Sequence, residues 1–189
     1  MRKILSLFVF FGLTTQVAMA IEISENYKTS FILPVDWSTK THRNLCVDIP
    51  ISYKSLQAPS TWDTAPLIEF IPKGENEDSW SEIITIQNLI ESQIQAKQMT
   101  STLIENISRA AKTTVLFQQT TFTKNEKSVF IIKYKHNGKE EVLGAQYLSG
   151  PFDCVGVQYT VRLSKKISEN EAVKKIKTFF DQNLAIVES

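Results

Sequence analysis

Hydrophobic and polar residues alternate through much of the second half of the chain, which is the pattern of half-buried β-strands. The alternation is clear in four segments, 113–123, 127–135, 141–148 and 154–163. Between the second and the third stands Asn137-Gly138, a pair typical of a two-residue hairpin turn. The pattern predicts a four-stranded antiparallel meander. Alternation places four residues on one face of its first strand: Val115, Phe117, Gln119 and Thr121.

Shorter runs of the same kind occupy the first half of the chain, at 31–37, 44–49, 67–71 and 80–87. Pro34 interrupts the first run, which favours an edge strand or an extended arm. In the last run, alternation that begins at Trp80 places Trp80 and Glu82 on one face of the strand. Polar residues and prolines predict surface loops at 52–65 and 72–80.

Two further segments have helical periodicity. In residues 92–111, apolar side chains recur at intervals close to those of an amphipathic helix. Near the C-terminus, Ser168 and Glu171 have the spacing of a capping box, which predicts that a helix begins there. That helix would carry its apolar residues on one face: Ala172, Ile176, Phe179, Phe180 and Leu184.

The order of these elements predicts an α+β fold. An antiparallel sheet of about six to seven strands would carry the long middle helix and the C-terminal helix. In the second strand of the meander, Phe130, Ile132 and Tyr134 look like the core face. The alternation of the meander is expected to leave one face of the sheet for both helices.

The first twenty residues have the pattern of a secretory signal peptide. Met1-Arg2-Lys3 is basic, an apolar run follows at 4–13, and Ala18-Met19-Ala20 has the small residues of a cleavage site. The apolar run is too short to span a membrane. We therefore expect a signal peptide over 1–20, a single domain over 21–189, and a secreted or periplasmic location.

The net charge and the cysteine content of the chain indicate which partners and which covalent bonds to expect. The chain has a formal net charge of +1, so neither nucleic acid nor an anionic membrane is an expected partner. No other segment is apolar enough to span a membrane. The only two cysteines, Cys46 and Cys154, predict one disulfide in an exported protein. In the chain-entropy model, a disulfide that closes so long a loop contributes roughly 4–5 kcal/mol.

Two segments carry a resemblance to a known family. Glu69-Phe70-Ile71-Pro72-Lys73-Gly74, followed by Ser79-Trp80-Ser81-Glu82-Ile83-Ile84-Thr85-Ile86-Gln87, resembles a motif of small exported proteins of Gram-negative bacteria, most of them uncharacterised. The order of elements is similar to that of PsbP/Mog1-like α+β sandwiches. The resemblance implies an envelope or secreted location and brings no catalytic residues. The Lys-, Asn- and Ile-rich composition fits an AT-rich genome, so a type II secreted, virulence-associated protein is one hypothesis.

No catalytic, cofactor or metal motif stands out. His42 and His136 lack the spacing of metal ligands, and G-x-S-x-G and phosphate-binding loops are absent from the sequence. We therefore expect no metal, no cofactor and no catalytic residue.

The leading hypothesis is a non-enzymatic binding protein with a protein, glycan or lipid partner. Its candidate recognition surface consists of Trp62, Glu69, Trp80 and Glu82. One alternative is a small secreted hydrolase or inhibitor-type effector with its site near the acidic Trp80 segment. Another is a periplasmic carrier that holds an apolar ligand between the helix at 92–111 and the sheet.

Overall fold

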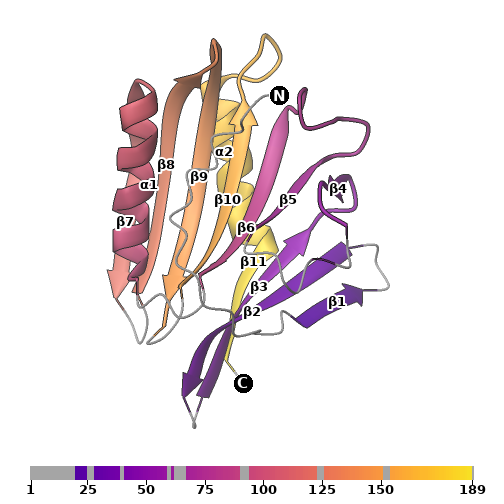
Figure 1. Cartoon of the computed structure of the whole chain (residues 1–189), viewed down its shortest axis with the longest axis vertical. Helices are drawn as coiled ribbons and strands as arrows, with labels where there is room; N and C mark the ends of the chain where they lie inside the picture. The colour runs from indigo at the N-terminus through magenta and orange to yellow at the C-terminus, as the bar shows by residue number, and fades with distance from the viewer. Residues whose placement is uncertain are drawn as a thin grey trace.

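The protein consists of two antiparallel sheets and two helices (Figure 1). The computed structural model describes residues 20–24, 28–38, 41–58, 61, 67–89, 94–122, 126–150 and 154–188. Apart from Ala20, the predicted signal peptide lies outside the described residues. No helix in these described ranges is long and apolar enough to cross a membrane. The predicted α+β class is confirmed.

The larger sheet contains the predicted meander. Its seven strands are, in spatial order, β4 (Tyr53–Ser55), β5 (Leu67–Pro72), β6 (Glu82–Leu89), β10 (Cys154–Arg162), β9 (Lys139–Ser149), β8 (Glu126–His136) and β7 (Thr113–Phe122). The last strand of the meander, β10, pairs with β6 and so joins the meander to the earlier strands. At the β8–β9 turn, Asn137 and Gly138 have φ of 48° and 79°, as the predicted type I′ hairpin requires.

A second, four-stranded sheet was only partly predicted. Its order is β1 (Ala20–Ser24), β2 (Lys28–Ser38), β3 (Thr41–Ile49) and β11 (Leu184–Glu188). The assignment of Leu184 to the C-terminal helix was wrong, because the helix ends there and Leu184 pairs with Val47 of β3. A run of five residues is too short for periodicity to separate strand from helix, so pairing with β3 decides the conformation.

The two helices cover opposite faces of the large sheet, as Figure 1 shows. α1 (Ala96–Ala110) packs on one face, where its residue Ala96 joins the cluster that contains Phe130, Ile132 and Tyr147. α2 (Glu169–Asn183) and the small sheet cover the other face. The prediction that both helices share one face was wrong. Since Phe130 and its neighbour Ile131 are both buried, the central strands have two apolar faces to cover.

α2 forms for the reasons expected from its sequence. The capping box is present, since the Ser168 side chain accepts from the Glu171 backbone N–H and the Glu171 carboxylate accepts from the Ser168 backbone N–H. Its buried residues are four of the five predicted: Ala172, Ile176, Phe179 and Phe180. α2 approaches the sheet closely at Gly144 of β9, where an added Cβ would overlap Ile176 Cγ2 and lie 3.2 Å from the Phe180 ring.

A β-bulge changes the predicted face of β7. The pairing of β7 with β8 shifts register between Val115 and Phe117. A bulge adds one residue to the strand, so the side chains after the bulge point to the opposite face from the one that simple alternation predicts. Val115 pairs with Ile132 and is 50% exposed, whereas Phe117 pairs with Ile131 on the α2 side. Val115 therefore does not share the face of Phe117, contrary to the prediction.

The structure contains no disulfide between Cys46 and Cys154. Leu45 and Val47 point into the core beneath the small sheet, so alternation directs Cys46 away from that core. Cys154 is buried in the cluster beneath α1, on the opposite face of the large sheet. Because the two side chains belong to different faces of the fold, the predicted disulfide is not supported.

Candidate functional site

Of the four residues predicted as a recognition surface, the structure describes three, Glu69, Trp80 and Glu82, and these do not all lie on one face of the large sheet. Trp62 lies outside the described residues. Glu82 is buried on the α2 side of the large sheet, opposite Val161 of β10. Glu69 pairs with Thr85, while its neighbours Ile68 and Phe70 belong to the core on the α2 side, so alternation directs Glu69 to the other face.

Trp80 has a structural partner, Arg162. The Arg162 guanidinium carbon lies 3.4 Å from the centroid of the Trp80 ring, and Arg162 Nη1 donates a 2.6 Å hydrogen bond to the Trp80 carbonyl. Arg162 Nε also donates to Glu141 Oε1 at 2.8 Å. Glu82 faces α2 together with Val161, whereas Arg162 follows Val161 and faces the other way. The prediction that Trp80 and Glu82 share a face was wrong, because β6 begins only at Glu82.

Glu82 lies at the centre of a largely buried polar cluster, which we call the Glu82 cluster: Glu82, Tyr53, Tyr159 and the exposed Lys175. Glu82 is 7% exposed, and its carboxylate accepts hydrogen bonds from Tyr53 (2.6 Å), Tyr159 and Lys175. Burial raises the pKa of Glu82, but the bonds from Lys175, Tyr159 and Tyr53 outweigh burial and lower it below the ordinary value. The carboxylate is therefore charged at neutral pH.

The two tyrosines of the Glu82 cluster are held in their neutral form. Burial is the largest cause that raises the pKa of Tyr53 and of Tyr159, and the hydrogen bonds to Glu82 raise both pKa values further. Their hydroxyls are 3.0 Å apart. The cluster ties β4, β6 and β10 to α2, so its chemistry is that of a buried structural connection.

The pKa of Glu69 is shifted upward, whereas that of Glu82 is lowered. The side chain is half-buried, and its backbone N–H donates a 2.9 Å hydrogen bond to Gln57 Oε1. Burial raises the pKa of Glu69 above its ordinary value of 4.5, and the charge of Glu77 raises it further. The folded state therefore disfavours the ionised carboxylate.

Glu69→Gln is expected to stabilise the protein at neutral pH, raising the unfolding midpoint by a few degrees. A raised folded-state pKa means that Glu69 costs stability as pH rises above 4.5, and the neutral amide removes that cost. Thermal unfolding at pH 7 and at pH 3.5 would measure the difference, which should disappear at the lower pH. Asp78→Asn, on the same hairpin but exposed, is the control. A gain from Asp78→Asn equal to that from Glu69→Gln would contradict this account.

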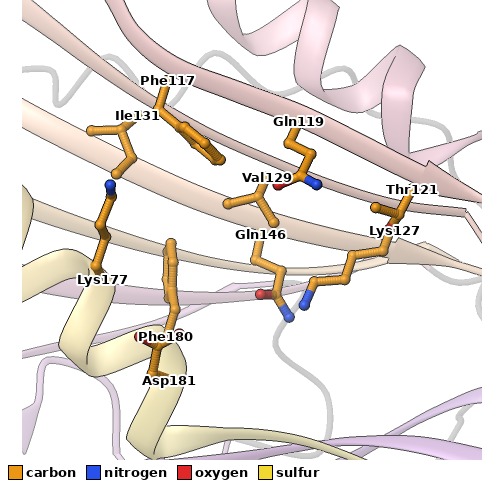
Figure 2. A pocket seen from close by; sticks show the side chains of 10 residues that line it. All are labelled: Phe117, Gln119, Thr121, Lys127, Val129, Ile131, Gln146, Lys177, Phe180 and Asp181. Atoms are coloured by element: carbon orange, nitrogen blue, oxygen red, sulfur yellow. The ribbon is translucent and has the colours of Figure 1, made fainter.

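A groove opens on the α2 side of the large sheet, between α2 and the strands β7, β8 and β9 (Figure 2). Its volume is about 350 Å³. Its apolar lining consists of Phe117, Val129, Ile131 and Phe180. Its polar lining consists of Gln119, Thr121, Lys127, Gln146, Lys177 and Asp181. We call this site the α2 groove.

Phe117 and Ile131 lie at a different end of the α2 groove from Lys127. Figure 2 shows Phe117 and Ile131 at one end with Lys177, whose ammonium lies 5.3 Å from the centroid of the Phe117 ring. Toward the other end lie Gln146 and Lys127. The groove therefore offers an apolar surface that continues into a basic, hydrogen-bonding region.

Gln146 is the most unusual residue of the α2 groove. Only 4% of it is exposed, and its side-chain amide has no hydrogen-bond partner among the described residues. Leaving a buried amide without a partner costs about 1–3 kcal/mol. Buried polar groups normally have a partner, so an amide that lines a cavity without one is suited to binding a molecule there.

The sequence did not identify the α2 groove. It did predict that Phe117, Gln119 and Thr121 share a face, and all three line the groove. The predicted carrier pocket was placed between residues 92–111 and the sheet, where the structure instead has the packed cluster around Ala96 and Tyr147. The α2 groove lies on the opposite face of the sheet. Residues that share one face of a strand do not reveal whether a groove forms over them. That depends on the element that makes the opposite wall, which here is α2.

Of the two histidines considered for metal binding, the structure describes the side chain of His136. His136 lies in the β8–β9 hairpin, with Nε2 2.9 Å from Asn137 Nδ2, and nothing is described for the His42 side chain. In the part of the chain that the structure describes, no group of three or more His, Cys, Asp or Glu side chains is placed to hold a metal ion.

Comparison with known proteins adds little to these observations. No protein-family model and no curated protein match the chain. Among solved structures, LpqN of Mycobacterium tuberculosis, which is involved in cell envelope biogenesis, matches with a TM-score of 0.48 and 12% identity over 84% of this chain and 91% of LpqN. A protein of Bacteroides thetaiotaomicron matches with a TM-score of 0.40 and 14% identity over 76% of this chain and 45% of its own. At these scores neither likeness supports a functional argument.

Proposed function

We propose that this protein is an exported binding protein that holds a small amphipathic molecule in the α2 groove. The observation that carries the proposal is the buried Gln146 amide, which lines the groove without a partner among the described residues. A ligand that supplies this partner would recover the free energy that the isolated amide costs.

The dimensions and lining of the α2 groove agree with this role. Small-molecule sites have volumes of about 300–1,000 Å³ and combine mostly apolar walls with a few polar groups. The groove, at about 350 Å³, falls at the lower end of that range and has Phe117, Val129, Ile131 and Phe180 as its apolar lining. A compact ligand with one apolar chain fits better than a bulky one.

Ligand binding can be tested with N-phenyl-naphthylamine, a neutral apolar dye that fluoresces when it leaves water. The wild-type protein is expected to increase its fluorescence in a saturable manner. Gln119→Trp should abolish the increase, because Gln119 lines the groove, is exposed, and can be enlarged without disturbing the core. Gln118→Trp is the matched control, since Gln118 is also exposed but pairs with Phe130, which faces α1.

Two results would overturn the proposal. One is the absence of any dye binding by folded wild-type protein. The other is undiminished binding by a Gln119→Trp variant whose circular dichroism and unfolding midpoint match those of Gln118→Trp. Either would mean that the groove takes up no apolar molecule.

Export is the second part of the proposal and rests on the N-terminal pattern of Lys3, the apolar run at 4–13 and Ala18-Met19-Ala20. Cell fractionation followed by intact-mass analysis tests it. A mass that corresponds to a chain starting at Ile21 in the periplasm or medium is expected, and full-length protein in the cytoplasm would contradict it. Release into the medium would favour a type II secreted, virulence-associated protein. Retention in the periplasm would favour an envelope role.

A further inference from the structure

We propose that the ligand of the α2 groove is a single-chain amphiphile with an acidic head group. In this arrangement Lys127 and Gln146 bind the acidic group, and the apolar chain lies against Phe117, Ile131 and Phe180. This inference rests on the proposed function and specifies the chemistry of the ligand and its orientation.

The charge of Lys127 is the first argument. Lys127 is half-buried on β8 and lines the groove. Among the described residues it has no ion pair, whereas Lys133 on the same strand lies 3.4 Å from Glu140 and 3.2 Å from Glu169. A partly desolvated ammonium without a counter-ion favours a ligand that carries negative charge.

The second argument is the position of Gln146 relative to Lys127. Gln146 of β9 pairs with Val129, and Lys127 lies two residues before Val129 on the same face of β8. Both side chains extend toward the same region of the groove (Figure 2). The Gln146 amide nitrogen can donate to one oxygen of a carboxylate or phosphate while the Lys127 ammonium binds another.

The other end of the groove cannot hold the acidic group equally well. Lys177 is exposed, and its ammonium lies near the face of the Phe117 ring. Asp181 is the one acidic residue in the lining. It lies one helical turn after Lys177 on α2 and would repel an anion bound next to Lys177. Phe117, which is only half-buried, instead provides apolar surface for a chain, with the buried Ile131 and Phe180 beside it. The acidic head therefore belongs with Lys127 and Gln146.

Displacement of bound N-phenyl-naphthylamine tests the head group with matched probes. Dodecanoate, dodecanol and dodecyltrimethylammonium have the same chain length and differ in charge. The two ionic probes are used below their micelle concentrations and dodecanol below its solubility limit. With protein expressed from its full sequence, dodecanoate is expected to displace the dye at a concentration about tenfold lower than dodecanol. Dodecyltrimethylammonium should be weaker than both, and acetate, which lacks the chain, should have no effect.

Variants assign the preference to the named residues. Lys127→Gln should remove the advantage of dodecanoate over dodecanol while leaving dodecanol unchanged. Gln146→Leu should weaken dodecanoate but preserve dye binding. Lys112→Gln removes one positive charge, as Lys127→Gln does, but from an exposed residue outside the groove. It should leave the displacement by all three probes unchanged.

The results that overturn this inference differ from those that overturn the proposed function. Equal displacement by all three probes, or unchanged selectivity in Lys127→Gln, would show that the groove binds apolar chains without regard to charge. Displacement by acetate as effective as by dodecanoate would indicate a simple anion site. Failure of every dodecyl probe to displace a dye that does bind would exclude a single-chain amphiphile. Only the absence of groove-dependent dye binding would count against the proposed function itself.

Discussion

Glu82→Ala is expected to reduce the free energy of unfolding by about 3 kcal/mol, because it removes the acceptor at the centre of the Glu82 cluster. Tyr53 and Tyr159 would lose the carboxylate to which they donate, and Lys175 would lose its ion-pair partner. The small side chain would also leave a cavity where the strands meet α2. Urea unfolding followed by circular dichroism at pH 7 measures the loss.

Controls separate the loss of the cluster from a general loss of acidic charge. Glu77→Ala removes an exposed carboxylate and should change stability by less than about 0.5 kcal/mol. Glu82→Gln keeps the shape and one acceptor oxygen, so it should fall between wild type and Glu82→Ala. Equal effects of Glu77→Ala and Glu82→Ala would show that the Glu82 cluster contributes nothing specific.

The pH dependence of the Glu82 effect has a defined sign. The folded-state pKa of Glu82 lies below its ordinary value of 4.5, so the charge of Glu82 stabilises the fold fully above pH 4.5. That contribution is lost as pH falls from 4.5 through the folded-state pKa. The stability difference between wild type and Glu82→Gln should therefore be constant near neutral pH and shrink in acid, opposite in direction to the effect expected for Glu69.

Gly144→Val is expected to be the second large effect, with a loss of about 3 kcal/mol. Already a Cβ at this position would overlap Ile176 Cγ2 and approach the Phe180 ring, so the larger valine would force α2 away from β9. Thermal and urea unfolding would measure the loss. Since α2 forms one wall of the α2 groove, weaker binding of N-phenyl-naphthylamine should accompany it.

A double-mutant cycle identifies the cause of this loss. Gly144→Ala and Ile176→Ala each destabilise the protein, but the second removes the methyl group that the new Cβ would meet. The double variant should lose less stability than the two single losses added together. Strict additivity would mean that the cost at Gly144 has another origin than contact with α2.

The sequence alone could not reveal the Glu82 cluster or the α2 groove. The three partners of Glu82 lie 29, 77 and 93 positions away along the chain, and the groove has walls on the meander and on the C-terminal helix. No local pattern records which distant side chains meet. The acidic residues near Trp80 favour a recognition surface that includes Glu82, although the structure buries Glu82.

Where the interacting groups lie within a few residues of each other in the chain, the sequence by itself determined the structure. The capping box at Ser168 and Glu171 and the positive-φ turn at Asn137-Gly138 were predictable because each depends on groups no more than three positions apart. The antiparallel meander followed from the Asn137-Gly138 turn and from alternation. Only the tertiary structure decided that the helices take opposite faces, that β11 joins β3, and that Gln146 is buried without a partner in the described chain. Those outcomes depend on which apolar faces meet, and many residues far apart in the chain determine that together.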